Sequence, residues 1–587
     1  MPMKKLKRSL DNILFLLRPA LKLGKGLLFL MLLAQALPSL VNSLVTVATP
    51  KVAIDGLLAG LPAGKIILNV GLLLLAQLAV IVVTNLLGFG VSVKQTEFGL
   101  KFTKLILQQS MVTDYRYLDK PEYYAKYQLT YQQFSTGSQN IFHSFIRLLS
   151  ALLTCAAMFA VIALLGPWVV MIVLAGSVVQ VFFSIREVKI NMQLTRESAE
   201  KSRGINYGAR MLQERQYAAD MKVSSMGTYV LAWVDKYIRW TKELQIRYVR
   251  PRMKLNLAAN VFNQVTTLGT VAYVIWGISS GKIGSIGDYA ALIAASSTLS
   301  VQLQSLFGVF SDMAQTSAQA EQAREFFDLP SVIEPSRGET PPKGPLSLEL
   351  RDVSFAYPEA DFCLKRLNIK IAPGEKIGVV GENGAGKSTM AKLLLRLYDV
   401  DSGDILYNGR SIRDWDVHEL RKRVGIAFQD ANLYALTLRE NLQYYNPEAS
   451  DEMRRKALHT VGLDRLDDME KTVSREFVED GIMLSGGETQ KLALARLLMD
   501  DFGLMILDEP SSALDPLAEY KMTKLMFDVS NTTTIMIAHR LSTIRDADRI
   551  YLISGGEVAE QGSHEELMAL NGRYAEMFRA QAENYTK

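Results

Sequence analysis

The stretch KIGVVGENGAGKST, Lys376 to Thr389, decides the fold of the C-terminal half of this chain. Its apolar run KIGVVG is typical of a buried strand, and it leads directly into a loop of the form G-x-x-x-x-G-K-[ST] and then into the helical stretch MAKLLLRLYD. Glycines let backbone N–H groups curl around phosphate oxygens, Lys387 neutralises the β- and γ-phosphates, and the Ser388 hydroxyl ligates magnesium. The motif therefore predicts a nucleotide-phosphate site made by Gly381, Glu382, Asn383, Gly384, Ala385, Gly386, Lys387, Ser388 and Thr389.

A second strand end supplies the rest of a nucleotide site. The apolar run FGLMILDEP predicts a buried strand that ends in two adjacent carboxylates. Asp508 is expected to hold the magnesium ion, directly or through water, and Glu509 to polarise the attacking water. Paired acids at a strand end can also cap a turn, but the phosphate loop favours the catalytic interpretation. A further strand, TTTIMIAHR, ends at His539, and we expect this histidine to contact the γ-phosphate.

A second candidate anion site lies at the start of a predicted helix, LSGGETQKLALARLL, Leu484 to Leu498. Small residues leave the approach open, the first backbone N–H groups of a helix are unpaired, and the helix dipole adds partial positive charge there. The residues expected to bind the anion at this helix start are Ser485, Gly486 and Gly487. Two phosphate-binding elements in one domain need an explanation.

The length and composition indicate two or more domains. A chain of 587 residues is too long for one core, and its two ends differ in character. Up to about residue 312 uncharged apolar runs alternate with charged ones, whereas a mixed α/β pattern follows residue 345. The net charge of +5 does not indicate a nucleic-acid partner. The two cysteines, Cys155 and Cys363, form no zinc spacing and no disulfide framework, so we expect free thiols.

The N-terminal half predicts a membrane domain. It contains five apolar stretches, and a helix needs about 20 apolar residues to span a membrane. One stretch is about twice that length and has Gly166-Pro167-Trp168 at its midpoint, which predicts a turn between two spans. Six transmembrane helices are therefore expected, within Gly26 to Pro50, Ile66 to Val93, Leu148 to Ile185, Leu255 to Ser280 and Tyr289 to Ser311. The links 94–147 and 186–254 are long, basic and largely free of Pro and Gly, which predicts helical extensions into the cytoplasm. The N-terminus is then also cytoplasmic, in a multi-pass protein of the cell (inner or plasma) membrane.

Both long links contain an aromatic, charged stretch with a turn signal. These stretches are DYRYLDKPEYYAKY, with Pro121, and RQYAADMKVSSMGTYVLAWVDKY, with Gly227. Each is either a solvated helical hairpin or a short transverse helix that docks on another domain.

With these motifs in order, the whole chain resembles the ATP-binding cassette (ABC) transporters, and in particular a half-transporter of the six-helix exporter type. The resemblance implies ATP and Mg²⁺ as ligands, and Glu509, His539, Gln429 and Lys387 as catalytic residues. It further implies that Tyr357 stacks on adenine and that Ser388, Gln429 and Asp508 serve the metal. LSGGETQ is similar to the family signature, with Glu488 where glutamine is frequent, and Asp515 ends the segment SALD that resembles the loop communicating between two sites.

The family pattern also answers why one domain has two phosphate-binding elements. It implies that the signature binds the γ-phosphate of an ATP held by the phosphate loop of an opposite ATPase domain, so a second half-transporter, identical or different, is needed. The implied fold is a helical membrane domain (1–320), a linker (321–345) and an α/β P-loop ATPase domain (346–587). The turns near Pro121 and Gly227 would be coupling helices that transmit closure of the ATPase dimer.

The implied activity is ATP-driven export by alternating access of an amphipathic peptide, drug or lipid, with no nucleic-acid partner. An importer built on the same fold and a nucleotide-gated channel or regulatory protein are the alternatives. Polar residues in the last two spans could line a cargo cavity or bond between helices, namely Asn256, Asn260, Asn263, Gln264, Gln302 and Gln304. His143 and Arg147 could meet an anionic cargo or lie at the membrane interface.

Overall fold

The chain forms two compact units. The computed structural model describes residues 26–586 except 166, 281–284, 331, 332, 334–337, 358–362, 511–513 and 530, together with residues 11, 12, 14, 15, 18 and 22. The helical unit comprises Met1–Thr113 and Lys120–Leu329, and the α/β unit comprises Asp114–Asp119 and Pro330–Lys587. The domain boundaries at residues 320 and 345 stay predictions, although the last helix of the helical unit continues to Phe327.

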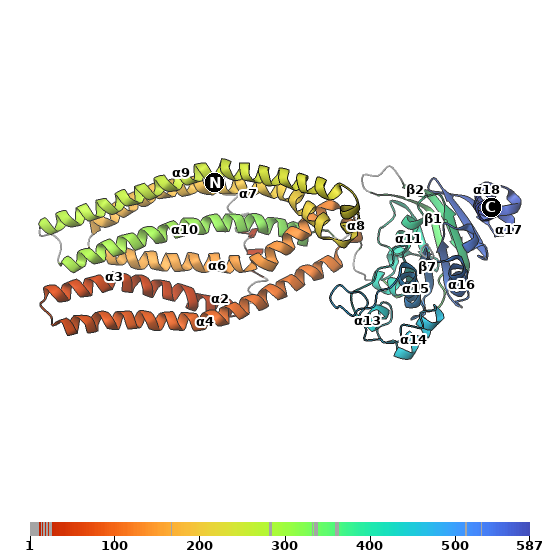
Figure 1. Cartoon of the computed structure of the whole chain (residues 1–587), viewed down its shortest axis with the longest axis horizontal. Helices are drawn as coiled ribbons and strands as arrows, with labels where there is room; N and C mark the ends of the chain where they lie inside the picture. The colour runs from red at the N-terminus through yellow and green to blue at the C-terminus, as the bar shows by residue number, and fades with distance from the viewer. Residues whose placement is uncertain are drawn as a thin grey trace. The chain divides into compact units, whose positions relative to one another are not determined.

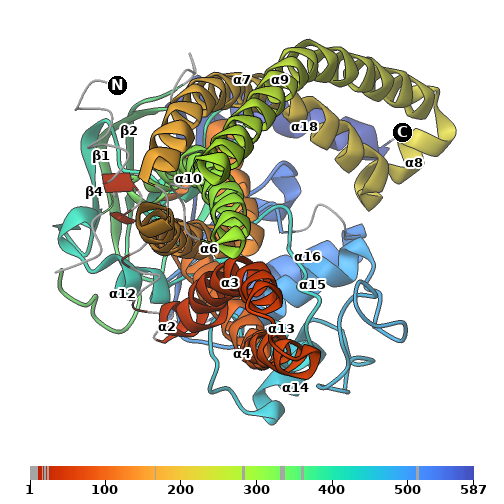
Figure 2. The same cartoon turned by 90° about the vertical axis from the view of Figure 1, so that its left-hand side faces the viewer.

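Long helices make up the helical unit (Figure 1). In chain order they are α2 (Leu27–Met31), the π-helical turn η1 (Leu32–Ala36), α3 (Leu37–Leu58), α4 (Ala63–Val112), α6 (Pro121–Leu165), α7 (Pro167–Gln213), α8 (Arg215–Val223), α9 (Met226–Ser279) and α10 (Ile286–Phe327). Neighbouring helices pack in pairs, α3 with α4, α6 with α10, and α7 with α9, and Figure 2 shows these pairs end-on. The turn expected at Gly166-Pro167 is confirmed, since α6 ends at Leu165 and α7 begins at Pro167; Gly166 itself lies outside the described residues.

Within the described residues, four helices are long and apolar enough to cross a membrane: Leu27–Leu58, Ala63–Val112, Phe142–Leu165 and Trp168–Leu194. Their apolar side chains are largely exposed, and this is expected where lipid rather than water surrounds a helix. The fifth and sixth expected spans lie in α9 and α10, and their crossing of the membrane stays a prediction. Residues 281–284, in the expected link between them, lie outside the described residues.

The helical extensions expected from the two long links are confirmed. Helix α4 runs on to Val112 and α7 to Gln213, well beyond their apolar runs. The first link breaks at the four-residue helix α5 (Tyr115–Leu118), which belongs to the α/β unit. There the Tyr115 ring lies edge-on to Tyr398 at 5.7 Å, and the Tyr398 hydroxyl donates to the Asp119 carboxylate. Residues 115–118 of the first link therefore form a short helix that packs within the α/β unit, which fits a docking helix rather than a solvated hairpin.

Two sheets build the α/β unit. The antiparallel sheet has the order β2-β1-β4-β5, and the other sheet has the order β10-β9-β3-β8-β7-β6. Their bounds are β1 (Leu348–Ala356), β2 (Cys363–Ile371), β3 (Lys376–Gly381), β4 (Ser402–Tyr407), β5 (Arg410–Ser411), β6 (Val424–Ala427), β7 (Leu504–Asp508), β8 (Thr533–Ile537), β9 (Arg549–Ser554) and β10 (Glu557–Gly562). Strands β3, β8, β7 and β6 are parallel neighbours, and their almost wholly buried apolar side chains explain their uninterrupted apolar runs.

Helices cover and connect these strands. They are α11 (Lys387–Leu394), η2 (Ile412–Asp414), α12 (Val417–Lys422), α13 (Leu438–Leu442), α14 (Asp451–Thr460), α15 (Gly486–Leu497), α16 (Pro516–Phe527), η3 (Leu541–Ile544), α17 (His564–Leu570) and α18 (Arg573–Thr586). Each parallel connection leaves the carboxyl end of a strand, where open α/β sheets bind their ligands.

Candidate nucleotide site

The candidate residues of the nucleotide site come together at one edge of the parallel strands. The phosphate loop follows β3, Gln429 follows β6, Asp508 and Glu509 stand at the end of β7, and His539 follows β8. These four strands are neighbours in the order β3-β8-β7-β6, so the sheet brings together residues up to 158 positions apart in the sequence, from Gly381 to His539. The sheet topology therefore builds the cluster that the motifs predicted one by one.

The glycines of the phosphate loop allow its backbone conformation, and its lysine side chain bonds back to carbonyl oxygens of the same loop. Gly386 caps α11 at φ 104°, in the left-handed region that favours glycine. A Cβ atom on Gly381 would lie 2.1 Å from the carbonyl oxygen of Ile553, so no larger residue fits there. Lys387 Nζ donates to the carbonyl oxygens of Gly381 (2.8 Å) and Glu382 (3.1 Å). Burial lowers the pKa of Lys387, while the carboxylates of Glu509 and Asp508 act in the opposite direction.

The remaining loop residues differ in exposure. Glu382, Asn383 and Gly384 are exposed, whereas Ala385 and Thr389 are buried. Glu382 accepts a hydrogen bond from Arg573 of α18, a contact that sequence motifs did not indicate. The exposed tip of the loop is thus the part that a ligand can reach.

Tyr357 lies beside this loop. Its hydroxyl is 3.3 Å from Thr389 Oγ1, and Lys392 Nζ lies 5.5 Å from the centre of its ring. The ring is only partly buried against Phe355 and Tyr398, at centroid distances of 5.1 and 5.4 Å. An accessible aromatic ring next to the phosphate loop fits adenine stacking.

Asp508 and Ser388 fit a magnesium ion. Asp508 is 4% exposed, and its Oδ1 atom has no hydrogen-bond partner among the described residues. Burial raises the pKa of Asp508, and a hydrogen bond from Ser388 lowers it. An unpaired buried carboxylate oxygen beside a serine hydroxyl matches the oxygen ligands that Mg²⁺ prefers.

Glu509 is held between two groups from neighbouring strand ends. Its Oε2 atom accepts a hydrogen bond from Gln429 Nε2 (2.9 Å), and its Oε1 atom lies 2.5 Å from His539 Nε2. The residue adopts φ 51°, which is uncommon without glycine, and its N–H donates to Ile537 O at 3.0 Å. Such backbone strain clusters at active sites, where it fixes a side chain's direction.

The signature residues lie at the N-terminus of α15. Ser485 caps this helix, and its hydrogen bonds all stay within the helix start, to Glu488 and Thr489. Ser485 and Gly486 are exposed, and Gly487 is partly exposed. Asp515 likewise caps α16 by accepting from the N–H groups of Leu517 and Ala518, and these bonds lower its pKa. The neighbouring Ser512 and Ala513 lie outside the described residues.

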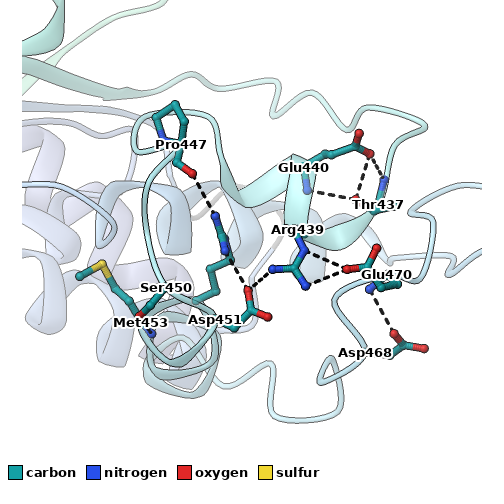
Figure 3. A network of polar contacts seen from close by, with 10 residues as sticks. Thr437, Arg439, Glu440, Pro447, Ser450, Asp451, Met453, Asp468 and Glu470 are labelled. Carbon is teal, nitrogen blue, oxygen red and sulfur yellow. Dashed lines mark hydrogen bonds and ion pairs between the residues drawn. The ribbon is translucent and has the colours of Figure 1, made fainter.

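Two arginines near the signature helix were missed by the sequence reasoning. Arg496 of α15 is buried and donates to Asn441 O, Asn441 Oδ1 and Asn432 O, each at 2.9 Å. Arg439 of α13 bridges the Asp451 and Glu470 carboxylates, as Figure 3 shows. The sequence signal that could have indicated a buried role for Arg496 is its charge inside the apolar run KLALARLL. Together these arginines fix α15 and α14 to the segment that follows Gln429.

Comparisons with known proteins identify this kind of site. Residues 364–512 match the family described as ABC transporter. The chain is 38% identical over 324 residues to the Beta-(1→2)glucan export ATP-binding/permease protein NdvA of Nitrobacter winogradskyi, covering 54% of this chain and 53% of that protein. It is 29% identical over 505 residues to the subtilin transport ATP-binding protein SpaT of Bacillus subtilis, covering 84% and 81%. The match to NdvA thus spans about half of that relative's length.

The fold of the whole chain is that of an ABC exporter. A bacterial Atm1-family ABC exporter, solved with ATP bound, superposes with a TM-score of 0.74 at 23% identity and covers 99% of both chains. The chain is therefore a membrane protein that is similar to ABC exporters and carries an ABC transporter ATP-binding domain over residues 364–512.

Proposed function

We propose that this chain is one half of an ATP-driven exporter, in which ATP binding and hydrolysis move an amphipathic substrate across a cell membrane by alternating access. The observation that carries the proposal is the convergence of Lys387, Asp508, Glu509 and His539 at the ends of adjacent parallel strands. The intact Glu509 and His539 favour a hydrolysing pump over a nucleotide-gated channel. An importer built on the same fold remains the alternative that a directional transport assay separates.

The loop after β3 binds the triphosphate in this proposal. Its exposed backbone N–H groups and the Lys387 ammonium contact the phosphate oxygens, and Tyr357 stacks on the adenine ring. Ser388 and Asp508, with Gln429, would hold Mg²⁺, which neutralises negative charge on the phosphates when bound.

Glu509 acts on the attacking water. Its carboxylate accepts a proton from the water, because its position and its strained backbone direct it from the end of β7 toward the γ-phosphate. Gln429 and His539 hold the two carboxylate oxygens in orientation. In this proposal His539 donates to the γ-phosphate once bound ATP replaces its contact with Glu509.

A second half-transporter completes each site in this proposal. The exposed N-terminus of α15 is free to meet a γ-phosphate held by another chain. The second long link supports a partner as well, since apolar residues around its turn are exposed: Val223 at 89%, Met226 at 47% and Tyr229 at 67%. Exposed apolar patches of this kind mark docking surfaces. Whether the partner is identical or different follows from the experiment below.

The proposed orientation follows from charge. The basic extensions of α4, α6, α7 and α9 lie on the cytoplasmic side, together with the N-terminus and the α/β unit, in the cell (inner or plasma) membrane.

A polar cavity of about 320 Å³ among α7, α9 and α10 is the proposed cargo site. Amide side chains line it, namely Gln180, Asn191, Asn256, Asn260 and Gln304. Gln180 is 5% exposed, so its amide lies at the inner wall of this cavity.

The charges of this cavity are internally paired. Arg252 lies 3.6 Å from Glu187, and Arg147 pairs with Asp312 at 2.6 Å. His143 instead contacts Gln35 and Gln95. A site whose charges are paired and whose lining carries several amides fits the neutral, hydrogen-bonding part of an amphipathic molecule better than an anion.

The experiment that tests the proposed function uses the full chain in lipid discs. We would measure particle mass and Mg²⁺-dependent ATPase activity, with Glu509→Gln as the control. A particle of twice 65.4 kDa whose hydrolysis is lost in the variant supports a homodimer. A folded monomer that binds ATP without hydrolysing it contradicts the homodimer and calls for a partner chain.

The cargo cavity has matched controls in the same helices. Gln180→Leu and Asn256→Leu should abolish stimulation of the ATPase by a neutral capped peptide, whereas Gln264→Leu and Gln302→Leu, which lie outside the lining, should keep it. Equal effects of all four variants would contradict the cavity as the cargo site.

A further inference from the structure

The residue after the signature glycines carries a negative charge into the proposed phosphate site. Glu488 Oε2 accepts hydrogen bonds from the Ser485 N–H at 2.9 Å and from the Ser485 hydroxyl at 3.0 Å. Any anion that Ser485 binds therefore lies within about 6 Å of this carboxylate, since two hydrogen bonds of about 3 Å meet at Ser485. The hydrogen bonds from Ser485 lower the pKa of Glu488, Arg465 lowers it further, and burial acts against both.

This charge opposes ATP binding. Two negative groups at such a distance repel each other, and the positive end of the α15 dipole is equivalent to only about half a charge. A carboxylate at this position is therefore a cost to the second anion site unless another group neutralises it.

Arg465 supplies the missing charge. Its Nε atom donates to Glu488 Oε1 at 2.8 Å, and its Nη2 atom lies 2.6 Å from the same oxygen. Arg465 thus holds one carboxylate oxygen while Ser485 uses the other, so it fixes the direction of the carboxylate as well as its charge. The segment that carries Arg465 follows α14, outside every motif of the nucleotide site.

The pair is too exposed to matter much for folding. The Arg465 side chain is 54% exposed and the Glu488 side chain 25%, and exposed ion pairs contribute little to stability. Its removal therefore tests electrostatics at the signature rather than the fold.

We propose that Arg465 is a positioning residue of the composite ATP site, which neutralises and orients Glu488 so that the N-terminus of α15 accepts a γ-phosphate from the opposite half-transporter. The inference rests on the proposed function of the signature helix, and it adds a residue that determines how tightly ATP closes the site.

A double-mutant cycle tests it in the full chain in lipid discs. Arg465→Gln should raise the KM for ATP about tenfold while kcat stays within about twofold, because about one charge is removed near the phosphate. Glu488→Gln removes the charge that Arg465 compensates, so adding Arg465→Gln to Glu488→Gln should change KM by less than about twofold. Lys471→Gln is the matched control, since it breaks a similar exposed pair, Lys471–Asp480 at 2.6 Å, and should leave KM unchanged.

A second readout separates this inference from the proposed function. In the Glu509→Gln background, we would measure the ATP concentration that half-saturates retention of radiolabelled ATP, and the same cycle should appear there. If the wild type does not hydrolyse ATP but the retention cycle holds, hydrolysis is wrong and the role of Arg465 stands. Equal impairment by Arg465→Gln with and without the Glu488→Gln substitution overturns the inference, because Arg465 then acts independently of Glu488. No effect of Arg465→Gln, or no ATP retention in any variant, overturns it as well.

Discussion

Replacing Arg496 by methionine should loosen the signature helix. Methionine keeps the length and apolar stem of arginine but loses three hydrogen bonds, to two carbonyl oxygens and one amide oxygen. The amide oxygen of Asn441 keeps a bond from the Tyr434 N–H, and the carbonyl oxygen of the exposed Asn432 can bond water, so the carbonyl oxygen of the buried Asn441 is the one left unpaired. That unpaired oxygen costs about 1–3 kcal/mol and the two other lost hydrogen bonds about 1 kcal/mol each, while relief from burying the guanidinium charge offsets part of the sum. We expect a net loss of about 2–4 kcal/mol.

Hydrogen–deuterium exchange of the α15 peptide measures this loss in the full chain. Amide exchange in residues 486–497 should accelerate about 30- to 1000-fold, because exchange of protected amides reports the local opening free energy. Arg455→Met is the matched control, since Arg455 is exposed on the neighbouring helix α14 and should change exchange less than about threefold. If both variants exchange alike, Arg496 does not fix the signature helix and the reasoning from its buried bonds is wrong.

Three further predictions follow from individual contacts. Asp508→Asn should flatten the pH dependence of Mg²⁺ affinity. Because the pKa of Asp508 is raised, the wild-type carboxylate takes up a proton and releases the cation as the pH falls toward that pKa. Equal pH profiles of Mg²⁺ titrations in the wild type and the variant would contradict this prediction. Asp119→Ala, which leaves the Tyr398 hydroxyl without its acceptor, should reduce transport per ATP hydrolysed about 2- to 30-fold while basal hydrolysis persists; unchanged coupling in proteoliposomes would refute a role for this contact. Gly381→Ala should abolish ATP binding, because the new Cβ atom would meet the carbonyl oxygen of Ile553. The Cβ atom of Gly384→Ala would meet no atom within 4 Å and adds only the strain of φ 79°, about 1 kcal/mol. Titration with fluorescent ATP should therefore show a much larger loss of affinity for Gly381→Ala than for Gly384→Ala.

The sequence predicted the parts of the site that local pattern specifies. Strands β3, β7 and β8 are short apolar runs, and each ends in the residues that bear the chemistry, so Lys387, Asp508, Glu509 and His539 could be placed before any tertiary contact was known. The turn at Pro167 was also predictable, since proline cannot continue a helix interior and an interface follows a span of sufficient length.

The contacts that fix the site could not be predicted in the same way. Arg496 and Asn441 are 55 positions apart, and Tyr398 and Asp119 are 279 apart. Neither pair belongs to a periodic pattern, because a side-chain partner depends on how the helices pack rather than on spacing along the chain. Arg465 shows the same limit, since a single exposed arginine carries no sign that it faces a carboxylate 23 residues later.

Ser485 and Glu509 already have hydrogen-bond partners within one chain, and this bears on why the proposed activity needs two. The Ser485 hydroxyl donates to Glu488, and the two oxygens of the Glu509 carboxylate contact Gln429 and His539, so both groups are engaged in the single chain. On the proposed function, a γ-phosphate must take the Ser485 donor from Glu488, and the attacking water must replace one of the partners of Glu509. In a lone chain Arg465 still pairs with Glu488, but no phosphate is brought to Ser485, whereas closure of two chains supplies both a phosphate for Ser485 and a signature helix for each phosphate. Hydrolysis is then linked to closure because the same bonds that hold the single chain at rest have to be exchanged for bonds across the dimer.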